Sequence, residues 1–145
     1  MALWAPDRPP AHHWEKAPGE PVCEADLSVD ALLRERLSAL LPQAAWLSEE
    51  SAETPGRAQA RFAWVIDPID GTRDFVAGRP GWAVSIALVE AGAVRIGILI
   101  VPARAECWWA VRGAGAFRND VRLRCGGHDR LAGARVPADH LRGMN

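Results

Sequence analysis

The chain has 145 residues, of which 49% are hydrophobic and 24% are charged, and its formal net charge at pH 7 is −1. This composition is typical of a globular domain, and a charge so close to zero gives no reason to expect a nucleic-acid polymer as a partner. No stretch has the length and apolar character of a membrane span or signal peptide, and the three widely spaced cysteines favour reduced thiols, so we expect a cytoplasmic protein that does not bind membranes.

Residues 1–21 contain five prolines, which disfavour a helix and predict a loose N-terminal arm. The adjacent His12 and His13 would point in different directions in any regular structure, so we expect no metal site there. From Ala25 onward, apolar residues recur every three or four positions, which predicts an amphipathic helix that ends at Pro42. Asp26 lies in the first turn of this helix, where capping is the simplest role for a carboxylate.

A short apolar segment at Trp46-Leu47 then leads into Ser48-Glu49-Glu50, and residues 52–60 have the composition of a surface loop. Adjacent glutamates are usually solvated surface residues. The next apolar run, residues 62–66, leads into Asp67-Pro68-Ile69-Asp70-Gly71-Thr72, which is the strongest candidate for chemistry in the chain.

Downstream of this motif, three segments alternate in a way that predicts antiparallel strands. These predicted strands span residues 82–89, 94–101 and 106–111. Gly113 and Gly115 resemble the start of a dinucleotide fingerprint, but Arg118 occupies the third glycine position, so we interpret them as a tight turn. Asn119-Asp120 predicts a further hairpin turn. The predicted fold class is α+β, an antiparallel sheet with flanking helices.

The turn predicted between Asp67 and Asp70 can direct both carboxylates and the Ile69 carbonyl toward one point. All-oxygen coordination selects Mg²⁺, or Mn²⁺, over zinc. The backbone amides of Gly71 and Thr72 can receive a phosphate group next to such a metal.

Other kinds of site fit the motif less well. An EF-hand loop is excluded because Ile69 and Gly71 stand where oxygen ligands are needed, and the chain contains no P-loop and no G-x-S-x-G element. An isolated D-x-x-D-G-T is more often a plain turn than a metal site. A Ca²⁺-binding module without catalytic activity is the remotest alternative.

Six segments carry a resemblance to a known family: residues 22–26, 47–51, 64–72, 74–75, 84–88 and 113–119. Together they resemble the inositol monophosphatase superfamily of Mg²⁺-dependent, lithium-sensitive phosphatases, which includes the 3′(2′),5′-bisphosphate nucleotidases. The resemblance covers Pro21 to about Val121. It implies a hydrolase that acts on a small phosphorylated metabolite: an inositol monophosphate or, as the alternative, a bisphosphonucleotide.

The resemblance also implies roles for individual residues. The implied metal ligands are Glu49, Asp67, the Ile69 carbonyl and Asp70. The implied phosphate-binding residues are Asp70, Gly71 and Thr72, and the residues implied to position and deprotonate the attacking water are Asp26, Thr72 and Glu49. The metal would neutralise the phosphate dianion and make water more acidic.

The chain also departs from the family pattern. The implied fold is an αβαβα sandwich, of which residues 22–124 would form a partial N-terminal domain, followed by an irregular tail over residues 125–145. The family's W-D element, which supplies a further metal-binding aspartate, is missing because no tryptophan here precedes an aspartate. We therefore expect a truncated member, with the second domain missing, that binds Mg²⁺ weakly and turns over little substrate alone, or an inactive paralogue. An exposed apolar sheet face would favour homo-oligomers. Cys23 stands where the family often has threonine.

Overall fold

The computed structural model describes residues 4–6, 12–17, 20–127, 129–130 and 133. The order of elements is as follows: β1 His13–Ala17, β2 Glu20–Cys23, α1 Glu24–Leu40, β3 Ala45–Ser48, the 3-10 turn η1 Arg57–Gln59, β4 Phe62–Asp70, α2 Thr72–Val76, β5 Ala83–Glu90, β6 Ala93–Val101, the 3-10 turn η2 Pro102–Arg104, β7 Glu106–Val111, β8 Gly115–Arg118 and β9 Val121–Arg122.

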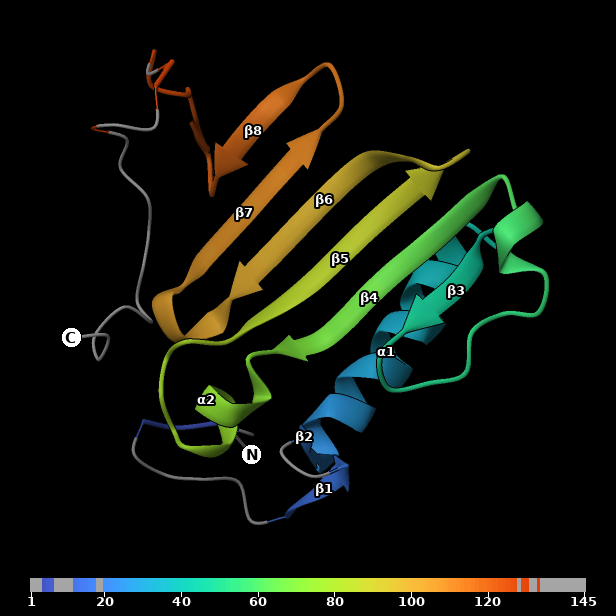
Figure 1. Ribbon diagram of the computed structural model, residues 1–145, viewed down its shortest axis with the longest axis vertical. Helices are drawn as coiled ribbons and strands as arrows, with labels where there is room; N and C mark the ends of the chain where they lie inside the picture. Colours follow the sequence, from blue (N-terminus) through green and yellow to red (C-terminus); the bar gives the residue numbers. More distant parts are fainter. Residues whose placement is uncertain (1–3, 7–11, 18–19, 128, 131–132, 134–145) are drawn as a thin grey trace.

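Seven strands form one sheet in the order β3-β4-β5-β6-β7-β8-β9 (Figure 1). The β3–β4 pair is parallel and every later pair is antiparallel, which confirms the predicted antiparallel meander after the acidic motif. The β5–β6 turn uses Ala91 and Gly92 with φ of 47° and 78°, the backbone handedness that tight hairpins require. The Asn119-Asp120 turn joins β8 and β9 as predicted.

Helix α1 packs on the sheet at its β3–β4 end (Figure 1). The predicted periodicity is confirmed, since Leu33 and Leu37 contact a buried cluster on the strands. This cluster consists of Trp46, Trp64, Ile66 and Ile86. A second cluster lies below the end of β4 and consists of Cys23, Ala25, Ile69, Phe75 and Trp82. Among the described residues, every fully buried side chain lies between Val22 and Ile86.

The ends of the chain differ in part from the predictions. The prediction of a loose arm over residues 1–21 is wrong for β1 and β2, which pair as an antiparallel two-stranded sheet. Pro21 lies opposite Glu15 in this ladder, a position that an edge strand tolerates. Residues 1–3, 7–11 and 18–19 of that arm lie outside the described residues. In the predicted tail, residues 125–127, 129–130 and 133 are in no helix or strand, and the other tail residues lie outside the described part of the chain.

Candidate metal and phosphate site

The predicted site lies where β4 ends and α2 begins. The β4–β5 register is regular up to Asp67 opposite Ser85 and is next defined at Asp70 opposite Ala83, with an irregularity between the two. Pro68 has no backbone N–H to give to a ladder, which accounts for a local departure from regular pairing at this point. The strand therefore carries one extra residue, a bulge, between its two aspartates and is paired again at Asp70.

Gly71 makes the sharp turn from β4 into α2. Its φ is +89°, in the left-handed region, and a Cβ built on it would lie 2.6 Å from the backbone oxygen of Gly81. No other residue type fits there without a shift of the backbone. The Gly71 carbonyl accepts hydrogen bonds from the amides of Asp74 and Phe75, at 2.8 and 3.1 Å, which starts the short helix α2. The glycine thus places Thr72 directly beside the end of the strand.

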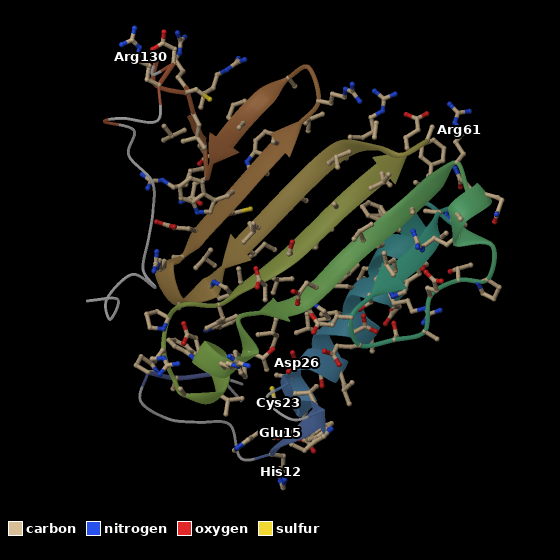
Figure 2. The ribbon with its side chains drawn as sticks, in the orientation of Figure 1. His12, Glu15, Cys23, Asp26, Arg61 and Arg130 are labelled. Carbon is tan, nitrogen blue, oxygen red and sulfur yellow. The ribbon has the colours of Figure 1, made fainter. Side chains whose placement is uncertain are left out.

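Asp26 lies at the junction of β2 and α1, beside Cys23 (Figure 2), and is only 1% exposed. One of its oxygens, Oδ2, accepts hydrogen bonds from the Cys23 backbone N–H and the Cys23 thiol, both at 2.9 Å. The predicted capping role is therefore confirmed: Cys23 is the N-cap residue and Asp26 completes a capping box. Burial, followed by the hydrogen bond to Asp26, raises the pKa of the Cys23 thiol to about 11, so the thiol stays protonated as a donor.

The other oxygen of Asp26 faces Thr72. Thr72 Oγ1 lies 3.4 Å from Asp26 Oδ1 and 2.9 Å from the Ile69 carbonyl oxygen, to which it can donate its proton. Sequence positions 26, 69 and 72 are thus joined by one side-chain hydroxyl. Capping and contact with Thr72 are compatible, because each uses a different carboxylate oxygen.

Asp67 lies in a strongly negative environment. Burial and the negative charges of Glu49, Asp70 and Asp26, in that order, raise its pKa from 3.8 to about 6. The strand register explains why Glu49 lies near Asp67. Ser48, the last residue of β3, pairs with Ile66 of β4 in the parallel ladder, and Glu49 and Asp67 are the residues that follow this pair. Glu49, Asp70 and Asp26 therefore all lie near enough to Asp67 for their charges to act on its carboxyl group.

The donor set fits a hard divalent cation. Glu49 and Asp70 are solvent-exposed, Asp67 is half-buried, and all three offer carboxylate oxygens. Burial and, after it, the uncompensated negative charge of the neighbouring acids raise the pKa of Asp67, and a bound cation would offset that charge. Within the described residues, no three histidine, cysteine or acidic side chains are already grouped closely enough to hold a metal.

Two features of the site were not predicted from the sequence. One is the buried pair of Asp30 in α1 and Ser48 in β3, whose only sequence signal is that Asp30 follows Asp26 by one helical turn. The other is a cavity of about 240 Å³ beside Asp70. Its walls include Gly81 and Trp82 from the segment before β5, and Arg104 from η2. This cavity arises from distant segments, so no local pattern indicates it.

Among the described residues, none of the helices has the length and apolar character needed to cross a lipid bilayer.

The chain is similar to a known family and to several known proteins. A family model described as the inositol monophosphatase family matches residues 8–142. A glucose-1-phosphate thymidylyltransferase of Streptomyces griseus is 44% identical over 104 residues, which cover 72% of this chain and 40% of that protein. An inositol-1-monophosphatase of Rhizobium meliloti is 39% identical over 119 residues, covering 82% and 44% of the two chains. A histidinol-phosphatase of Chlorobaculum parvum is 42% identical over 106 residues, covering 73% and 40%.

The fold is shared with solved structures. The suhB extragenic suppressor protein of Bartonella henselae superposes with a TM-score of 0.76 and 37% identity, over 83% of this chain and 46% of that one. The chain thus spans less than half the length of the relatives and of the solved structure that it matches.

Proposed function

The chain belongs to the inositol monophosphatase family, whose model matches residues 8–142, and we propose that its acidic site supports Mg²⁺-dependent hydrolysis of a small phosphomonoester. The observation that carries this proposal is the contact between Asp26 and Thr72 beside the acids of β4. A carboxylate, a hydroxyl and a carbonyl oxygen are joined by contacts of 3.4 Å or less, next to Asp67 with its raised pKa.

Asp26 and Thr72 are proposed to act on the attacking water. A water that donates to Thr72 Oγ1 can lose its proton to the hydroxyl while the hydroxyl passes its own proton to Asp26 Oδ1, 3.4 Å away. The water oxygen then attacks phosphorus as the bond to the leaving oxygen breaks. The leaving alkoxide takes a proton from solvent water and Asp26 returns its proton to solvent, which gives inorganic phosphate and an alcohol. The two donors from Cys23 hold the other Asp26 oxygen, which keeps Oδ1 directed at Thr72.

Glu49, Asp67, the Ile69 carbonyl and Asp70 are the proposed ligands for Mg²⁺, with Mn²⁺ as a substitute. When bound, the cation would neutralise the phosphate dianion and make water more acidic. Asp70, with the backbone amides of Gly71 and Thr72, is proposed to position the phosphate. The left-handed Gly71 leaves this backbone free of a side chain that would keep the phosphate away.

The substrate is proposed to be an inositol monophosphate, in line with the family and with the relative named inositol-1-monophosphatase. A 3′(2′),5′-bisphosphonucleotide is the alternative that the resemblance allows, and the relative named histidinol-phosphatase adds another small phosphomonoester. The chain spans 40–44% of the length of these relatives. An inactive paralogue is the third candidate. We propose a cytoplasmic location.

The test is phosphate release by the purified chain from inositol 1-phosphate, histidinol phosphate and a 3′,5′-bisphosphonucleotide. Each reaction is run with Mg²⁺ or Ca²⁺, with and without lithium. Asp67→Asn removes one proposed ligand and its charge with little change in volume. Asp120→Asn, an exposed aspartate in the β8–β9 turn, is the matched control.

We expect weak Mg²⁺-dependent release that Asp67→Asn lowers to the level without enzyme and Asp120→Asn leaves unchanged. Release that does not depend on Mg²⁺, or that survives Asp67→Asn, would refute the proposal. No release, together with Mn²⁺ binding that Asp67→Asn abolishes, would select the inactive paralogue.

A further inference from the structure

A second buried carboxylate lies one helical turn beyond Asp26. Asp30 in α1 is only 5% exposed, and its Oδ1 accepts a hydrogen bond from the hydroxyl of Ser48, itself 8% exposed. Burial of a carboxylate is costly unless it is hydrogen-bonded, so this pair must form if α1 is to pack against β3. None of the proposed steps of hydrolysis uses it.

Ser48 has a second partner at the same oxygen. Its Oγ accepts the backbone N–H of Glu50 at 3.3 Å, so one hydroxyl is bound both to the helix and to the chain that leaves β3. The residue enclosed by this turn is Glu49. Because Ser48 pairs with Ile66 in the parallel ladder, the fixed turn holds Glu49 alongside Asp67.

We propose that Asp30 and Ser48 are positioning residues that hold Glu49 beside Asp67, an inference that rests on the metal-binding role proposed for Glu49. Helix α1 then supports the site at two points. Its first buried acid, Asp26, faces Thr72 at the end of β4, and its second, Asp30, fixes the end of β3. The two acids lie one turn apart on one face of the helix. A single rigid element therefore contacts both the end of β3 and the end of β4.

A contact that served packing alone would have a different signature. Its loss would lower the free energy of unfolding and leave the Glu49 turn and its affinity for a cation as they were. Loss of a positioning contact loosens the turn while the fold persists. Residues that orient a metal ligand typically change metal affinity by about 10- to 100-fold when they are removed.

The experiment uses the whole chain and four variants. Ser48→Ala removes both the donor to Asp30 and the acceptor for Glu50, whereas Ser48→Thr retains the hydroxyl. Asp30→Asn retains an oxygen that can accept the hydrogen bond from the Ser48 hydroxyl. Ser28→Ala is the matched control, because it removes a hydroxyl that bonds the Glu24 carbonyl on the exposed face of the same helix.

The first readout needs no metal: hydrogen exchange of the Glu50 amide, measured by NMR together with urea unfolding. We expect Ser48→Ala to speed this exchange by about tenfold or more, while amides in β4 and β5 stay protected, and Ser48→Thr, Asp30→Asn and Ser28→Ala to stay near the original rate. Exchange that is unchanged in Ser48→Ala would overturn the inference. If Ser48→Ala does not fold, the Glu50 amide of the original chain decides instead. Exchange of that amide as fast as in an unfolded peptide would also overturn the inference.

The second readout is the affinity for Mn²⁺, followed by the loss of the free-ion signal in electron paramagnetic resonance. We expect Ser48→Ala to weaken binding by about tenfold and Ser48→Thr to restore it. A loosened turn with unchanged affinity would refute the positioning role. If the original chain binds no Mn²⁺, the metal role in the proposed function fails, and Glu50 exchange decides separately whether Asp30 and Ser48 order the turn.

Discussion

The sheet has two unlike halves. The helix-covered half, residues 22–86, carries α1, α2 and both buried clusters, whereas the meander half, residues 87–122, has no fully buried side chain among its described residues. Every proposed site residue lies in the helix-covered half. A site that must hold several like charges close together therefore lies on the part of the sheet with the most packing beneath it.

The meander half is held mainly by its strand ladders and by contacts on its surface. Trp109 stacks on Phe117 with ring centroids 4.2 Å apart, and Arg118 lies over the Trp108 ring. Several large apolar side chains remain exposed: Val94 by 56%, Leu99 by 40% and Val121 by 62%. Homo-oligomerisation stays a prediction.

The largest expected difference between the halves is in the effect of removing an aromatic ring. Phe75 is 2% exposed and meets Trp82 edge-on with ring centroids 4.8 Å apart, so Phe75→Ala should lower the free energy of unfolding by about 3–5 kcal/mol. Trp109→Ala in the meander half should cost less, about 2 kcal/mol, because this half-buried ring loses its stacking on Phe117 and the hydrogen bond from its indole N–H to the Asn119 carbonyl. Urea denaturation measures both, and equal losses would mean that the halves are packed alike.

A smaller difference is expected between two glycines that share a left-handed backbone. At Gly92, with φ +78°, an added Cβ would have no neighbour within 4 Å, so Gly92→Ala should cost about 1 kcal/mol of strain alone. Gly71→Ala adds the collision with the Gly81 oxygen and should cost about 2 kcal/mol or more. Thermal melts measure the melting temperature of each variant. If Gly92→Ala melts at the lower temperature, the close approach of the Gly71 and Gly81 backbones is contradicted.

The smallest expected effect is on pH dependence, and it has opposite signs in the two halves. The pKa of Asp67 is raised to about 6, so the folded chain holds this proton more tightly than the unfolded chain. Its contribution to stability is complete below about pH 4 and is lost as the pH rises through about 6. In the metal-free chain we expect a loss of about 1 kcal/mol, because solvent screens this half-buried group, and Asp67→Asn should abolish that loss.

Glu90 is the control in the meander half. Hydrogen bonds from Arg61, and the nearby Arg95, lower the pKa of the Glu90 carboxyl. Its contribution is therefore present above its unfolded pKa and is lost as the pH falls, so Glu90→Gln should reduce stability at neutral pH and not at low pH. Urea midpoints from pH 3 to pH 7, taken as differences from the original chain, isolate each group. An Asp67 contribution that grows as the pH rises would contradict the expected sign.

Much of the fold could be predicted because its signals are local. Alternation of side chains indicated the strands near Trp82 and Val94, and apolar residues every three or four positions located α1 to within two residues at each end. The N-terminal pairing of β1 and β2 could not be predicted, because prolines disfavour a helix without excluding an edge ladder. Asp67 and Asp70 were identified by their motif, and Asp26 and Glu49 by the family resemblance, whereas the proximity of these acids depends on how the strands and α1 pack.

The features that escaped prediction depend on contacts between distant segments. Asp30 is an ordinary helix residue in the sequence, and only the packing of α1 on β3 brings it to Ser48. Cys23 departs from the family pattern, but its thiol donates to Asp26 only because Cys23 is the N-cap residue. The proposed roles of Glu49, Asp67, Asp70 and Thr72 stay predictions, although the structure brings these residues to one end of β4.

The parallel pairing of β3 with β4 has a consequence for the conformational entropy that the chain loses on folding. The strands of the meander half are joined by tight turns, such as Ala91-Gly92, and their pairing closes very short loops. Pairing of Ser48 with Ile66 must instead close a loop that contains the whole of residues 49–61, and a parallel pair cannot form as a hairpin. Glu49 is therefore placed near Asp67 by the entropically most demanding pairing in the described sheet, and Leu33 and Leu37 of α1 pack against the buried cluster that includes the tryptophans of both paired strands.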